Sequence, residues 1–176
     1  MAESDSLARP RFFTGKLLTA EDFAQEQQYV LEKLKRHNRS LHGFGIVSGL
    51  KVTTKSGKIA VDPGMALDCQ GNEIVIGTTQ LLSPPAAGET QGPAYVNIRY
   101  AEASEDPVTT DGVAHGSTIK ESFEIQVEKE NCNRGHRHVR ARWLACGERH
   151  ALTIAKLKHS SQGWRVDRSY RPPAVK

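Results

Sequence analysis

The stretch "TAEDFAQEQQYVLEKLKRHNRSLHGFGIVSGL", residues 19–50, marks a change from helix to β structure. Thr19 is a good N-cap, and Asp22 three positions later gives a variant of the capping box, so a helix is predicted to begin here. Its apolar side chains form a narrow stripe, which is typical of a helix that packs along one seam only. The stripe consists of Phe23, Val30, Leu31 and Leu34. The glycines after His42 then predict the end of the helix.

From residue 43 onward the chain reads as short strands between turns. "LKVTT" and "KIAVD" flank the turn "KSGK", and "SFEIQVE" alternates apolar and polar side chains, as a half-buried strand does. We therefore predict a mostly β protein with one long N-terminal α-helix, in which short strands form an antiparallel sheet or sandwich. The predicted parts are an extended arm (1–18), the helix (19–42) and a β domain (43–176) with loops at 83–93 and 101–118.

Composition excludes several classes of protein. The chain has 176 residues, of which 38% are hydrophobic and 25% charged, so a globular fold with one core is expected. The sequence contains no run of eighteen apolar residues, so no transmembrane helix is predicted. The N-terminus lacks the pattern of a signal peptide, so synthesis in the cytoplasm is expected. The net charge of +4 is mild and comes with no recognition motif, which disfavours nucleic-acid binding.

The stretch "CNRGHRHVRARWLACGERH", residues 132–150, contains the pattern Cys-x3-His twice. Thiolate and imidazole are zinc ligands, and four of them close a structural site. The Cys2His2 set would be Cys132, His136, Cys146 and His150, with His138 as a spare ligand. The alternative is that the cysteines are small apolar residues and the histidines lie in polar turns.

Catalysis has no positive support in the sequence. The chain contains no G-x-S-x-G, no H-E-x-x-H, no P-loop and no dinucleotide fingerprint, so no small-molecule substrate is indicated. A zinc hydrolase remains an alternative. It would use His136, His138 and His150 as ligands with Glu148 as base, and would need an open coordination position.

Residues 11–52, "RFFTGKLLTAEDFAQEQQYVLEKLKRHNRSLHGFGIVSGLKV", resemble an N-terminal module of proteins from phage tails and phage-tail-like contractile injection systems. In that module an arm leads into a helix and then into "LHG.G.V.GL". "IAVDPGMALDCQGNEIVI", residues 59–76, is similar to its recurring β unit, and residues 152–172 resemble its closing hairpin. In the β unit, Gly64 and Gly71 are expected to supply positive φ angles for tight turns.

The resemblance implies a structural, non-enzymatic component of a particle, belonging to its baseplate, fibre or spike and contacting other subunits. Fibres and spikes of this kind are commonly trimeric, so a homotrimer is expected, and a zinc site would stiffen a spike tip. A fibre-type module that binds a glycan is the alternative, although loops 83–93 and 101–118 contain no aromatic residue. The residues expected to form assembly contacts are Phe12, Phe13, Phe23, Tyr29, Leu31 and Leu34.

Overall fold

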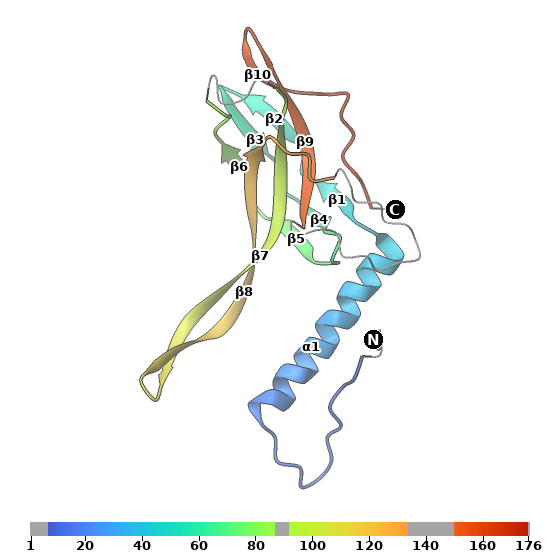
Figure 1. Cartoon of the computed structure of the whole chain (residues 1–176), viewed down its shortest axis with the longest axis vertical. Helices are drawn as coiled ribbons and strands as arrows, with labels where there is room; N and C mark the ends of the chain where they lie inside the picture. The colour runs from blue at the N-terminus through green and yellow to red at the C-terminus, as the bar shows by residue number, and fades with distance from the viewer. Residues whose placement is uncertain (1–6, 87–91, 134–149, 176) are drawn as a thin grey trace.

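The computed structural model describes residues 7–86, 92–133 and 150–175. An extended arm leads into the helix α1 (Ala20–His37), which continues as one short π-helix, η1 (Asn38–His42). Strands then make up most of the remaining chain, and α1 projects away from them (Figure 1). The predicted fold class, mostly β with one long N-terminal helix and antiparallel sheets, is confirmed.

The helix begins where the sequence predicts, because its cap is local. The Thr19 side chain accepts a hydrogen bond from the Asp22 backbone N–H, and the Asp22 carboxylate accepts one from the Thr19 N–H at 3.2 Å. Both halves of the predicted capping box are therefore present. Lys16 Nζ also lies 2.5 Å from the Asp22 carboxylate, which ties the arm to the first turn of α1.

The described strands form three antiparallel sheets. The first has the order β1-β4-β5 (Gly45–Gly49, Gly64–Leu67, Glu73–Ile76), and the second has the order β2-β3-β6 (Val52–Lys55, Lys58–Val61, Gln80–Leu82). The third has the order β10-β9-β7-β8 (Gly163–Val166, Ala151–Ser160, Ala94–Thr110, Val113–Glu128). The buried core draws side chains from all three sheets, among them Ile59, Ile74, Ile98 and Leu152.

The predicted loop over residues 101–118 is wrong. β7 and β8 run for 17 and 16 residues and pair in one register from Tyr95↔Glu128 to Thr110↔Val113, with a gap at Asp106, whose φ is 52°. A two-residue turn, Asp111-Gly112 with φ of 52° and 77°, joins them, and Asp-Gly suits this hairpin turn because both positions need positive φ. The hairpin extends well past the sheets (Figure 1). Of the other predicted loop, residues 83–86 and 92–93 lie outside helices and strands.

The turn between β4 and β5 holds the C-terminal end of the helical segment. Gly71 has a φ of 90°, as predicted, and a Cβ atom there would lie 2.2 Å from the Lys35 carbonyl oxygen. Asn38 Nδ2 donates to the Gly71 carbonyl at 3.0 Å, and Arg39 Nη1 donates to the Gln70 carbonyl at 2.6 Å. Gly64 is different, because its φ is not positive. It permits close approach of β4 to β1, where a Cβ would lie 2.3 Å from the Ser48 carbonyl oxygen.

Candidate functional site

The arm and α1 both present exposed apolar side chains, which we together call the arm–helix surface. No residue of α1 is buried, so the helix contributes nothing to the core of its own chain. By the helical period, the side chains of the stripe fall within about a third of a turn of one another. The arm–helix surface consists of Phe12, Phe13, Leu17, Leu18, Phe23, Val30, Leu31 and Leu34.

Five of the six residues expected to form assembly contacts belong to this surface, and Tyr29 does not. By the helical period Tyr29 lies on another side of α1, where it is half-buried. The Arg9 guanidinium lies 6.0 Å from its ring centroid, and Lys33 Nζ lies 5.7 Å away. Tyr29 therefore contacts the arm of its own chain.

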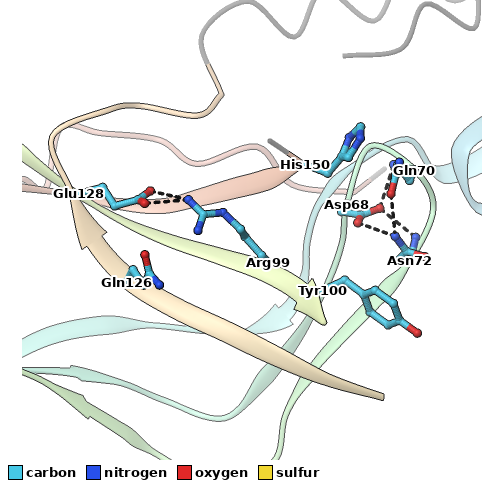
Figure 2. A pocket seen from close by; sticks show the side chains of 8 residues that line it. All are labelled: Asp68, Gln70, Asn72, Arg99, Tyr100, Gln126, Glu128 and His150. Atoms are coloured by element: carbon cyan, nitrogen blue, oxygen red, sulfur yellow. Dashed lines mark hydrogen bonds and ion pairs between the residues drawn. The ribbon is translucent and has the colours of Figure 1, made fainter. Parts of the chain in front are cut away.

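A polar pocket of about 500 Å³ lies between the β4–β5 turn and the third sheet. The turn is held by Asp68, whose carboxylate accepts hydrogen bonds from the backbone N–H groups of Gln70 and Asn72 at 2.8 and 2.9 Å. Figure 2 shows this turn and His150 on one side of the pocket and the Arg99–Glu128 pair on the other. The lining residues are Asp68, Gln70, Asn72, Arg99, Tyr100, Gln126, Glu128 and His150.

The sheet wall of the pocket is a bonded polar network. Arg99 Nη2 donates to both carboxylate oxygens of Glu128, at 2.7 and 2.8 Å, and this pairing raises the pKa of Arg99. Asn97 is fully buried, and its Nδ2 donates to Glu128 at 2.5 Å. The Thr153 hydroxyl donates to Asn97 Oδ1 at 2.6 Å. These contacts satisfy the buried polar atoms of Asn97 and Thr153, whereas Arg99 Nε is buried without a hydrogen-bond partner among the described residues.

Cys132 is fixed by the same network. Its backbone N–H donates to the Thr153 hydroxyl at 2.9 Å, and its side chain is buried. Burial raises the pKa of the Cys132 thiol, and the charge of Glu128 raises it further against the opposing effect of Arg99. The thiol therefore favours its protonated form, which is the behaviour of a buried apolar cysteine.

The structure describes two of the five predicted metal ligands, Cys132 and His150. His136, His138 and Cys146 lie outside the described residues, as does the proposed base Glu148. The contact that the structure does show was missed: Cys69 Sγ lies 3.2 Å from His150 Nδ1. Within residues 7–86, 92–133 and 150–175, no three His, Cys, Asp or Glu side chains are placed to hold a metal ion. The zinc site stays a prediction.

No helix among the described residues is long and apolar enough to cross a membrane.

Comparisons with known proteins add to the fold. No protein-family model matches the sequence, and no curated protein matches it. Among solved structures, the crystal structure of TssK matches with a TM-score of 0.56 and 14% identity, over 96% of this chain and 42% of that chain. A chain in the baseplate complex from the type VI secretion system matches with a TM-score of 0.56, 12% identity and the same coverage of both chains.

A third match is the cryo-electron microscopy structure of the type VI secretion system TssK-TssF-TssG baseplate subcomplex. Its TM-score is 0.52 at 14% identity, over 96% of this chain and 62% of that chain. The chain thus spans less than two thirds of the length of the proteins it matches. At these identities the matches show a shared fold, which includes almost the whole of this chain.

Proposed function

We propose that this chain is a structural, non-enzymatic baseplate component of a contractile injection particle of the phage-tail type. Two lines of reasoning support the proposal. The fold is similar over 96% of the chain to TssK and to a type VI secretion system baseplate complex. The residues 11–52 independently resemble a module of phage-tail-like particles. A part in such a particle acts through contacts with other subunits.

The observation that carries the proposal is the exposure of α1. A helix of 18 residues without one buried side chain keeps its apolar stripe in water. Burial of each Leu or Phe of the stripe would contribute about 1.5–3 kcal/mol. Exposed apolar patches of this kind mark interaction sites. We propose that copies of the chain pack their α1 stripes around a common axis, with a trimer favoured.

The test is the oligomeric state of the full chain by native mass spectrometry and analytical ultracentrifugation. We expect a trimer, and we expect Leu31→Asp with Leu34→Asp to raise its dissociation constant by about a hundredfold or more, because each carboxylate would be desolvated in the seam. The control is Val75→Asp with Leu81→Asp, two residues of the sheets that are 58% and 70% exposed, against 42% and 47% for Leu31 and Leu34. A parent chain that stays monomeric at high concentration would refute the self-association.

We also propose a structural zinc in the region of His150. The contact between Cys69 and His150 supports this, because it brings together two zinc-ligand side chains that are 81 residues apart. Native mass spectrometry of protein purified without affinity metal would measure the zinc content. We expect about one zinc per chain, lost in His150→Ala and retained in His115→Ala, whose histidine lies on the exposed part of β8. A metal-free parent chain would rule the site out.

A further inference from the structure

The projecting part of the β7–β8 hairpin, residues 102–121, is a two-stranded ribbon with every residue exposed. β9 pairs with β7 only as far as Arg99↔Ala151. Beyond this point, within residues 7–86, 92–133 and 150–175, β7 and β8 pair only with each other. Isolated two-stranded hairpins are marginally stable in water, and their unpaired edges invite contact with another chain. The ribbon therefore has the form of an element that becomes covered in an assembly.

One face of the ribbon carries its large apolar side chains, together with the carboxylates of the opposed pair Glu102↔Glu121. Directly opposed residues of an antiparallel pair share a face, and the faces alternate along each strand. The pairs Ser104↔Ile119, Val108↔His115 and Thr110↔Val113 consequently place three large apolar side chains on one face. This face continues the one that is buried in the core sheet, yet Val108, Val113 and Ile119 are 54%, 55% and 70% exposed.

The ribbon is also acidic, in a chain with a net charge of +4. Residues 102–121 hold five carboxylates and a single lysine, which gives a net charge of −4. Lys120 already pairs with Glu105 at 3.3 Å, so it neutralises a charge within the ribbon itself. The carboxylates are those of Glu102, Glu105, Asp106, Asp111 and Glu121. A partner for this element should be basic and apolar together.

The N-terminal arm, residues 7–18, has that composition. It contains two arginines, one lysine and no acidic residue, and it carries exposed apolar side chains such as Phe13 and Leu17, which are 66% and 84% exposed. Lys16 is bound to Asp22, whereas Arg9 stacks loosely on Tyr29. Among the described residues Arg11 makes no ion pair, so two arginines are available to an acidic partner.

The positions of the two elements determine which copy of the arm meets the ribbon. The ribbon and α1 project past the same end of the β domain, and the arm turns near the start of α1 (Figure 1). If the symmetry axis of the oligomer runs along the α1 stripes, rotation from one copy to the next does not change the height of an element along that axis. In such an assembly the arm of one copy and the ribbon of the next lie at the same level.

We propose that the ribbon of one copy binds the arm of a second copy. The aromatic side chains of the arm would lie on the ribbon face that carries Val108, Val113 and Ile119, and its arginines would lie near the carboxylates of the ribbon. The proposal rests on the proposed self-association along α1. It identifies a second contact, separate from the contact between the α1 stripes. In this contact each copy uses its arm to bind one neighbour and its ribbon to bind the other. Contacts of this type close a ring when the rotation between copies closes.

Cross-linking between differently tagged copies of the full chain tests the contact. One copy carries Phe13→Cys and the other Ile119→Cys, and a short bis-maleimide joins them. We expect a product that contains both tags. In the matched control the second copy carries Leu81→Cys in place of Ile119→Cys. Leu81 is also 70% exposed, but it lies on β6 and not on the ribbon. A single chain that carries both Phe13→Cys and Ile119→Cys reports any contact within one copy.

Charge reversal provides the second measurement. We expect Arg9→Glu with Arg11→Glu, or Glu105→Lys with Glu121→Lys, to raise the dissociation constant of the oligomer about tenfold, because like charges would then meet. Mixing the two variants should restore the parent value to within about threefold, since the reversed charges attract. Lys51→Glu with Lys55→Glu, on exposed residues of the β domain, is the control for a change in net charge.

The outcomes separate this inference from the proposed function. A parent chain that is monomeric refutes both. An oligomer that is broken by Leu31→Asp with Leu34→Asp, but shows neither the cross-link nor a response to charge reversal, refutes only the arm–ribbon contact. A cross-link confined to single chains carrying both cysteines shows that the arm binds its own ribbon, which also overturns the inference.

Discussion

At the scale of single residues, Gly71 determines whether α1 can sit on the β domain. Its φ of 90° excludes a side chain, and so does the Lys35 carbonyl oxygen, which would lie only 2.2 Å from a Cβ atom at this position. We expect Gly71→Ala to cost at least about 1–2 kcal/mol for the left-handed backbone alone. The clash adds to this cost, and it is relieved if the helix end moves away from the turn.

Hydrogen exchange and thermal unfolding would measure the Gly71→Ala effect. We expect a lower unfolding midpoint and faster exchange of the amides of residues 35–39, because their contacts with the turn are lost. Gly77→Ala is the matched control, since its φ is ordinary and a Cβ there meets nothing within 4 Å. Equal behaviour of the two variants would show that the turn does not hold the helix.

Asp167 gives the fold a pH dependence. Its carboxylate accepts a hydrogen bond from the Ser169 hydroxyl at 2.7 Å and lies 2.9 Å from Lys158 Nζ, and these contacts lower its pKa below the ordinary value of 3.8. A lowered pKa in the folded state stabilises the protein above the unfolded-state value, and this stability is lost as the pH falls below it.

We therefore expect Asp167→Asn to lower the unfolding midpoint at pH 7, with the difference from the parent shrinking as the pH falls below about 4. Thermal unfolding followed by circular dichroism between pH 3 and 7 would show it. Asp111→Asn is the control, because this exposed turn residue has a φ of 52° that asparagine adopts readily. A difference that stays constant with pH would contradict the assignment.

Single residues also show which parts of the site the sequence could predict. Thr19 and Asp22 are three positions apart, so the cap is a local pattern and was predicted correctly. The contact between Cys69 and His150, and the network of Asn97, Thr153 and Cys132, join residues that are far apart in the sequence and lie on strands or at their ends. Nothing in the local sequence encodes these contacts, because sheet topology alone brings the strands together.

At the scale of elements, the β7–β8 hairpin is the main departure from the sequence-based expectation. Residues 101–118 are polar and contain Pro107, features that favour a loop. The available signal was the pair Asp111-Gly112, which is a strong hairpin indicator when strands flank it. This signal was missed because the alternation of apolar and polar residues that predicts a strand does not continue into the exposed residues 102–121.

The ribbon should be removable without loss of the fold. Glu102 and Glu121 oppose each other, as Thr110 and Val113 do. The two pairs are an even number of residues apart along each strand, so they have the same type of pairing and residues 103–120 can be replaced by the Asp-Gly turn alone. We expect this shortened chain to keep its unfolding midpoint within about 3 °C, because none of residues 103–120 is buried. Differential scanning calorimetry would measure it, and a large drop would show that the ribbon supports the core.

At the scale of the whole molecule, two projecting elements extend from one compact β domain. The core lies within the three sheets, while α1 and the ribbon leave it at the same end (Figure 1). The general architecture followed from the order of periodicities in the sequence, helix first and strands afterwards. The projection of the ribbon did not, because its residues 102–121 are all exposed and so leave no pattern of burial in the sequence.

The attachment of α1 at one end has a mechanical consequence. In the part of the chain that the structure describes, the side-chain hydrogen bonds that join the helical segment to the β domain come from Asn38 and Arg39, at its C-terminal end. An 18-residue helix is about 27 Å long, so a tilt of about 5° at this joint moves its far end by about 2 Å. A neighbour that grips the Ala20 end can therefore shift by atomic distances while the sheets keep their packing. The joint acts as a pivot, and the helix as a lever that transmits torque to it.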